Sequence, residues 1–203
     1  MRLIRRATTL LMASTSVQAS TAPPLYDVVV YGASGFTGRL AVEYLTDRYA
    51  TSGLKWAIAG RSRERLDAVL QETKAEVPII VADATDAASV DAMVAQTKVL
   101  LNYAGSPYIT KALPVVEACA RHGTHYVDVT GEVALHRASL SKYDAKAKET
   151  GALIVHSCGY DSIPSDLGYL LASDAYQERY NAQPERARLL TRGFEGGGIS
   201  GDT

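Results

Sequence analysis

The chain of 203 residues has a formal net charge of −1, with 47% hydrophobic and 21% charged residues. This length accommodates one domain with a substantial core, and the composition is ordinary for a globular protein. The near-neutral charge excludes a bulk field that would attract nucleic acid or an anionic membrane. Cys119 and Cys158 show neither CxxC spacing nor metal-ligand clustering with the four histidines, so we expect reduced thiols and no metal site.

Residues 1–24 differ in composition from the rest of the chain. They contain Arg2, Arg5 and Arg6, many Ser and Thr, and no acidic residue, which is typical of a mitochondrial presequence. A secretory signal peptide with a cleavage site near Ala19, an internal start at Met12 and a disordered N-terminus remain alternatives. We expect a cytoplasmic or mitochondrial protein without a membrane span, because no apolar run reaches about 18 residues.

Beyond Pro24, short apolar runs alternate with segments of helical periodicity. In chain order we expect a strand at 26–31, a helix at 36–49, a strand at 56–60, a helix at 63–73, a strand at 77–82, a helix at 87–96, a strand at 98–103, a helix at 107–122, a strand at 125–129, a helix at 139–149, a strand at 152–156 and a helix at 165–180. Continuous apolar strands that alternate with helices are typical of a parallel sheet covered on both faces. The sequence therefore predicts an α/β fold, a Rossmann-type doubly wound parallel sheet over residues 25–182, with 183–203 as the truncated start of a second, substrate domain.

A glycine-rich loop joins the first expected strand to the first expected helix. Gly32 permits a tight turn, Gly35 has no Cβ and lets a diphosphate approach the backbone, and Gly38 lets the helix lie close to the sheet. The helix N-terminus offers free N–H groups to the phosphates, with Ser34 and Thr37 as additional donors. The residues predicted to contact the cofactor here are Gly32, Ala33, Ser34, Gly35, Phe36, Thr37 and Gly38. The spacing GxxGxxG indicates a dinucleotide ligand without defining the reaction.

The end of the second expected strand distinguishes between the two nicotinamide cofactors. An NAD site usually places Asp or Glu there, on the ribose 2′-hydroxyl, whereas this chain has Arg61 and Ser62. The guanidinium of Arg61 can pair with a 2′-phosphate, and Ser62 can donate a hydrogen bond to it. We therefore predict NADP in preference to NAD, and we assign Arg65 to a solvated helix face.

Two further segments follow expected strands and border the same crevice. Asp83 can accept a hydrogen bond from the adenine amino group, with capping of the next helix as the alternative. In the segment 102–105 the small residues admit the ribose, and Asn102 can fix the local backbone. The additional predicted cofactor-binding residues are Asp83, Asn102, Tyr103, Ala104 and Gly105.

Five sequence blocks together resemble one family. They are Gly32–Gly38, Ala59–Ser62, Asn102–Gly105, Tyr126–Glu132 and Cys158–Gly168. From Tyr26 onward the chain is similar to the saccharopine dehydrogenase-like oxidoreductases, which include the trans-acting enoyl reductases of mycobacterial glycolipid synthesis. The resemblance implies an NADP-dependent reductase of a lipid-like enone or an imine, lipid-droplet or membrane association in eukaryotic members, and dimerisation through a second domain. Where the family usually reads Gly-Gly-Thr, this chain reads Gly201-Asp202-Thr203.

The segment after the last expected strand holds the best cluster of polar side chains. It follows a strand end, where open α/β sheets bind ligands. We predict that Tyr160 or Asp161 supplies the proton that accompanies hydride transfer. The alternative is that Asp161 braces the turn before the helix. The Tyr-x-x-x-Lys pair of short-chain reductases is missing, because 108–111 and 143–146 each separate Tyr from Lys by only two residues.

Asp128 and Glu132 flank the end of the fifth expected strand. They can bind a substrate ammonium group, or Asp128 has a structural role while Glu132 starts a helix. Cys158 lacks a clearly basic neighbour that would activate it as a nucleophile.

Two classes of function follow from these features. The leading hypothesis is an NADP-dependent oxidoreductase that transfers hydride to a small-molecule or lipid-like substrate, without a nucleic-acid partner. The alternative is a non-catalytic NADP(H)-binding or sensing module. The small number of candidate catalytic residues and the truncation favour this alternative. A homodimer through the missing second domain is the expected assembly.

Overall fold

The computed structural model describes residues 23–190 and residue 193. The predicted leader therefore lies almost entirely outside the described residues, as does most of the segment 183–203, including Gly201-Asp202-Thr203. Among residues 23–190 no helix combines the length and the apolar character needed to cross a membrane.

Six parallel strands form one sheet in the order β3-β2-β1-β4-β5-β6. The strands are β1 (Tyr26–Tyr31), β2 (Trp56–Gly60), β3 (Ile79–Val81), β4 (Thr97–Asn102), β5 (His125–Asp128) and β6 (Ile154–Val155). The helices are α1 (Phe36–Tyr49), α2 (Arg63–Thr73), α3 (Ala87–Val94), α4 (Tyr108–Lys111), α5 (Leu113–His122), α6 (Val133–Thr150) and α7 (Ile163–Tyr180). The predicted Rossmann-type α/β fold is confirmed.

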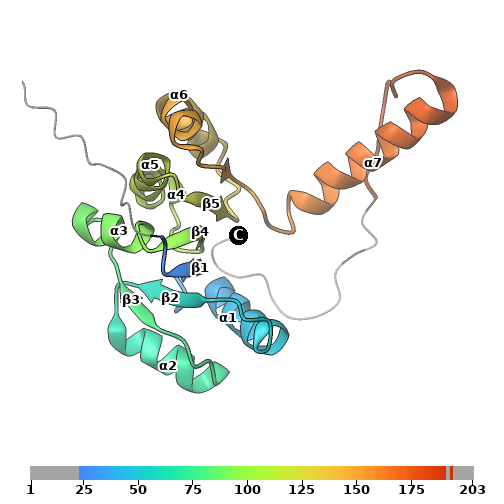
Figure 1. The fold of residues 1–203 in the computed structure, drawn as a ribbon. Helices are drawn as coiled ribbons and strands as arrows, with labels where there is room; N and C mark the ends of the chain where they lie inside the picture. Colours follow the sequence, from blue (N-terminus) through green and yellow to red (C-terminus); the bar gives the residue numbers. More distant parts are fainter. Residues whose placement is uncertain (1–22, 191–192, 194–203) are drawn as a thin grey trace, which may run out of the picture.

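Two buried clusters hold helices to opposite faces of the sheet (Figure 1). On one face Val30 and Ile58 pack with Val42 of α1 and Leu66 of α2. On the other face the buried cluster consists of strand residues with residues of α3 and α5: Val29, Tyr31, Leu100, Tyr126, Val90, Met93, Val115, Val116 and Cys119. Adjacent residues of β1 thus face opposite clusters, as the pleat requires, and β2 is buried along its whole length.

The order of the strands reverses next to β1. After β1, the chain adds β2 and then β3 on one side of β1. It then returns, and β4 pairs with the other side of β1, with Val29 beside Leu100. The loops that follow β1 and β4 therefore leave the carboxyl ends of these two strands in different directions. Open α/β sheets bind ligands in the crevice at such a reversal.

Two predicted helices differ from those observed. The helix expected at 107–122 is divided into α4 and α5, because Pro114, in the first turn of α5, cannot donate to the carbonyl of Thr110 and its ring would clash with it. The helix expected at 139–149 begins six residues earlier, at Val133, directly after Glu132. Its end at Gly151, with φ +80°, matches the expected one.

Helix α7 extends away from the rest of the chain (Figure 1). Ser173 is its single buried residue, while Leu167, Leu170 and Leu171 are exposed. The helix contributes to the site only through the loop that precedes it.

Candidate functional site

The loops after β1, β2, β3 and β4 enclose a pocket of about 290 Å³ at the carboxyl edge of the sheet. We call it the glycine-loop pocket, defined by Gly32, Ser34, Gly35, Arg61 and Asp83. It also contains Tyr103, Ala104 and Gly105, so most of the predicted cofactor residues lie together.

The glycine loop has no room for side chains at two positions. Gly32 has φ +84°, and a Cβ there would lie 2.5 Å from the backbone nitrogen of Ala104. A Cβ on Gly38 would lie 2.2 Å from the carbonyl oxygen of Gly32. A Cβ on Gly35 would meet only the Gly32 oxygen, at 3.3 Å, and Gly35 itself is exposed. The backbone at Gly35 is therefore open to a ligand, as predicted.

The first turn of α1 suits a diphosphate. Gly35 is the N-cap residue and provides no side-chain cap, and the turn contains no acidic residue. Uncapped N–H groups and the helix dipole attract an anion at this position. The residues present therefore fit the phosphates of a dinucleotide.

The other glycine-loop residues lie in three different places. Ser34 lines the glycine-loop pocket, whereas Phe36 and Thr37 line the neighbouring pocket described below. Ala33 is fully buried, and its side chain packs in the core beside α1.

Cationic side chains lie at the mouth of the glycine-loop pocket. Arg61 lines it as predicted, and so do Arg65 and Lys111. Arg65 is exposed on α2, as expected of a solvated helix face, and its Nη2 also donates to the carbonyl oxygen of Ser34 at 3.4 Å.

Ser62 and Asp83 have local hydrogen-bond partners. Ser62 Oγ accepts from the N–H of Arg65 as the cap of α2, which leaves its hydroxyl proton available. Asp83 does not cap α3, since Asp86 does so by accepting from the N–H of Ala88. Instead, hydrogen bonds from the N–H and hydroxyl of Thr85 hold the pKa of Asp83 below its usual value. The alternative of a capping Asp83 is therefore wrong, and its carboxylate faces the pocket.

A second pocket, of about 480 Å³, adjoins the first. We call it the aromatic pocket, defined by Phe36, Tyr103, Tyr108, Tyr160 and Val129. It shares four residues with the glycine-loop pocket, namely Gly35, Tyr103, Gly105 and Ser106. The predicted proton donors Tyr160 and Asp161 both line it, on the loop before α7.

Glu132 lines the aromatic pocket but is engaged with the backbone. Its Oε1 accepts from the N–H of Tyr108 at 2.6 Å, and its Oε2 accepts from the N–H of Ile109 at 3.0 Å. The carboxylate thus caps α4 across 24 residues of sequence. Since both oxygens serve this helix end, a role in binding a substrate ammonium group is not supported.

A buried hydrogen-bonded chain lies beneath the two pockets. Asn102 Nδ2 donates to the Tyr126 hydroxyl at 2.8 Å, and that hydroxyl donates to Asp128 Oδ2 at 2.9 Å. Asp128 Oδ2 also lies 2.7 Å from His156 Nδ1. At the other end, Asn102 Oδ1 accepts from the N–H of Ala104, which confirms that Asn102 fixes the local backbone.

Asp128 has the structural role that was one of its two predicted alternatives. Its Oδ1 accepts from the N–H groups of Thr130 and Ser157. Burial alone would raise the pKa of Asp128, but the bonds from His156 and from the two N–H groups outweigh it and hold the pKa below its usual value. The loops after β5 and β6, which both border the aromatic pocket, are therefore hydrogen-bonded to the same carboxylate.

The thiols of both cysteines are shifted toward the protonated form. Burial raises the pKa of both thiols, and for Cys158 the Asp128 carboxylate adds to the effect. Among the described residues both cysteines are free, and no group of His, Cys, Asp and Glu is arranged to hold a metal ion.

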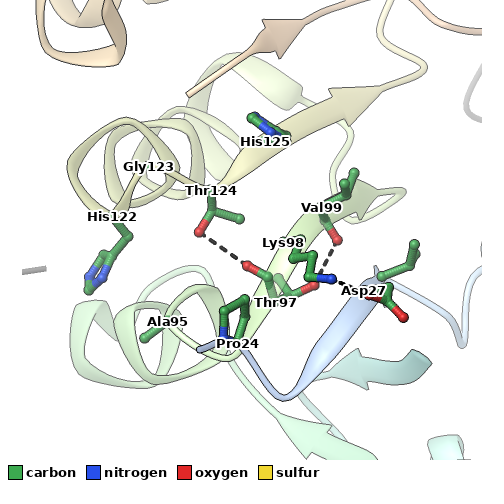
Figure 2. Close-up of a pocket in the computed structure, with 11 residues that line it drawn as sticks. Pro24, Asp27, Ala95, Thr97, Lys98, Val99, His122, Gly123, Thr124 and His125 are labelled. Atoms are coloured by element: carbon green, nitrogen blue, oxygen red, sulfur yellow. Dashed lines mark hydrogen bonds and ion pairs between the residues drawn. The ribbon is translucent and has the colours of Figure 1, made fainter. Parts of the chain in front are cut away.

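A larger pocket, of about 500 Å³, lies at the opposite edge of the sheet (Figure 2). It borders the amino ends of β1, β4 and β5, away from the glycine loop. Its polar groups bond to each other, as in the 2.6 Å ion pair between Lys98 and Asp27 and the hydrogen bond from Thr124 to the carbonyl of Thr97. The loops with dinucleotide-binding geometry are all at the other edge.

Strand order, glycine loop and uncapped helix together define a dinucleotide-binding α/β domain. The family model of the saccharopine dehydrogenase NADP-binding domain matches residues 28–155, and the chain belongs to this family. The predicted family and its cofactor, NADP, are thereby confirmed.

Similar proteins are longer than this chain. It is 46% identical over 145 residues to the trans-acting enoyl reductase of Mycobacterium tuberculosis, covering 70% of this chain and 34% of that protein. It is 42% identical over 173 residues to the lipid droplet localized protein of Caenorhabditis elegans, covering 82% of this chain and 40% of that protein. The chain spans 34 to 43% of the length of the curated relatives it matches.

A solved structure shares the fold. The saccharopine dehydrogenase (L-Glu forming) of Saccharomyces cerevisiae superposes with a TM-score of 0.58 at 20% identity, covering 77% of this chain and 32% of that one.

Proposed function

We propose that this chain is the NADP(H)-binding portion of an oxidoreductase that reduces the carbon–carbon double bond of a neutral, apolar enone. Bound NADPH supplies the hydride in this reaction. The main support for this proposal is that two chemically different pockets adjoin and share lining residues. One pocket has cationic side chains and backbone donors, and the other has aromatic walls.

The glycine-loop pocket supports NADP(H) as the ligand. The α1 N-terminus and Gly35 suit the diphosphate, and Arg61 with Arg65 suits a 2′-phosphate. Tyr103 and Gly105 line both pockets, and they would hold the nicotinamide end of a dinucleotide bound in this way.

The walls of the aromatic pocket favour an enone over an imino acid. Phe36, Tyr103, Tyr108 and Val129 contribute apolar walls, and none of the lining residues in the described part of the chain is Lys or Arg. An amino-acid-derived imine carries carboxylates, which need a cation when they are buried. The names of the mycobacterial relatives agree with this choice, and the name of the nematode relative agrees with a lipid-like substrate and a location at lipid droplets.

Oxidation of NADPH by the 203-residue chain tests the proposal. The substrates to compare are medium-chain enones, cyclic imino acids, and saturated ketones as controls that lack the double bond. We expect oxidation with the enones alone, followed as loss of reduced-nicotinamide absorbance. Turnover with imino acids alone would contradict the substrate class. Tight NADPH binding without turnover of any substrate would favour the non-catalytic module.

A further inference from the structure

Tyr103 is the one large side chain that lines both pockets. The other three shared residues are Gly35, Gly105 and Ser106. Tyr103 comes directly after β4, at the reversal of strand order. Its ring therefore lies at the boundary between the predicted cofactor site and the predicted substrate site.

The position of Tyr103 is fixed from three sides. Its N–H donates to the carbonyl oxygen of Tyr31 at 2.8 Å, which extends the pairing of β1 with β4. The next N–H, of Ala104, is held by Asn102 Oδ1 at the end of the buried hydrogen-bonded chain. The ring packs against the buried cluster that contains Val30 and Val42. A side chain held in this way needs no reorganisation to meet a ligand.

The hydroxyl of Tyr103 has no hydrogen-bond partner within residues 23–190 and 193, unlike the buried hydroxyl of Tyr126. Tyr103 is half-buried, and burial raises the pKa of its phenol, so the hydroxyl keeps its proton. Tyr160, by comparison, is 67% exposed. Tyr103 thus provides a protonated, preoriented donor at the junction of the pockets.

We propose that the Tyr103 hydroxyl is the proton donor of the reaction, an inference that rests on the proposed function. Hydride adds to the β-carbon of the enone, and the π electron pair moves toward the carbonyl, which leaves negative charge on its oxygen. The Tyr103 O–H donates a hydrogen bond to this oxygen and then transfers its proton to it, and the resulting enol tautomerises to the saturated ketone. The resulting tyrosinate regains a proton from water, so one hydride and one proton are consumed for each double bond.

A binding experiment tests this role separately from turnover. The probe is cyclohexane-1,3-dione, whose enolate resembles the charged intermediate, titrated by calorimetry into the 203-residue chain saturated with NADP⁺. Tyr103→Phe keeps the ring and removes the donor. Because a hydrogen bond to a charged group is involved, we expect the probe to bind about 10- to 100-fold more weakly, while the variant still binds NADP⁺.

Tyr143→Phe is the matched control. Its hydroxyl donates to Glu117 outside both pockets, so probe affinity should equal that of the unchanged chain. Equal probe affinity in Tyr103→Phe and the unchanged chain would overturn the proposal, as would a loss seen in Tyr160→Phe instead. A chain that binds NADP⁺ but not the probe would also overturn it, with the proposed cofactor intact. Failure to bind NADP⁺ at all would overturn the proposed function itself.

Discussion

Asp128 connects three segments through one buried carboxylate. It accepts hydrogen bonds from the Tyr126 hydroxyl within β5, from the N–H of Thr130 after β5, and from Ser157 and His156 after β6. These segments border the aromatic pocket or support it. The residue therefore stabilises the fold and the shape of the pocket together, without contacting a ligand.

We expect Asp128→Asn to lower the free energy of unfolding by about 2–4 kcal/mol at pH 7, because it weakens the hydrogen bonds of a buried carboxylate. The pKa of Asp128 is lowered in the folded chain, so its stabilisation is complete above about pH 4, the unfolded value, and is lost as pH falls through the folded value. Denaturant unfolding between pH 7 and pH 3 should therefore show the difference between variant and unchanged chain shrinking below about pH 4.

Asp144→Asn is the control for this series. Asp144 pairs with Lys148 on the exposed side of α6, and a surface pair contributes less than about 1 kcal/mol. If Asp128→Asn behaved like Asp144→Asn, the buried hydrogen-bonded chain would not stabilise the fold.

Gly38 is a position where one methyl group should disrupt the glycine loop. The added Cβ of Gly38→Ala would lie 2.2 Å from the Gly32 oxygen and 2.9 Å from the Ala33 Cα, and both are backbone atoms that cannot rotate away. We expect a loss of about 2–4 kcal/mol in unfolding free energy. Gly168→Ala in α7, which meets nothing within 4 Å, should change stability by no more than about 1 kcal/mol. Equal stability of the two variants would contradict the close packing of α1 on the loop.

At the level of elements, the strands were predictable because they are short, continuous apolar runs. The core strands β1 and β2 match their predicted bounds. The first six residues of α6 were missed because their apolar pattern is weak. The helix as a whole packs against α5, a tertiary contact that a single segment does not reveal. The division between α4 and α5 was signalled locally by Pro114, but the cap of α4 by Glu132 is a tertiary contact across 24 residues.

Glu132 provides a test of that contact. Glu132→Ala removes both acceptors from the N–H groups of Tyr108 and Ile109, and loss of a helix cap costs about 1 kcal/mol. Glu132→Gln retains one carbonyl oxygen and should lie between the alanine variant and the unchanged chain in denaturant unfolding. An alanine variant as stable as the unchanged chain would show that Glu132 does not cap α4.

At the scale of the whole molecule, the site is the meeting of six loops, one after each strand, at one edge of a parallel sheet. The sequence predicted this edge, since glycine loop, Arg61, Asp83 and segment 102–105 all follow strands. It did not reveal that Arg65 turns back toward Ser34, or that Tyr103 lies between two pockets. Both depend on how loops distant in sequence approach each other, and no local periodicity encodes that approach.

The NADP(H) site is tested most directly by the affinity of the folded chain for NADPH and for NADH. Both affinities are measured by calorimetry, with Arg61→Ala as the variant. We predict tighter binding of NADPH, a loss of about 10- to 100-fold for NADPH in Arg61→Ala, and little change for NADH. Arg63→Ala is the control, because Arg63 pairs with Asp67 and does not line the glycine-loop pocket. Equal affinity for the two nucleotides, or equal loss of both in Arg61→Ala, would contradict a 2′-phosphate site at Arg61, and binding of neither by the folded chain would contradict the assignment of this edge as the cofactor site.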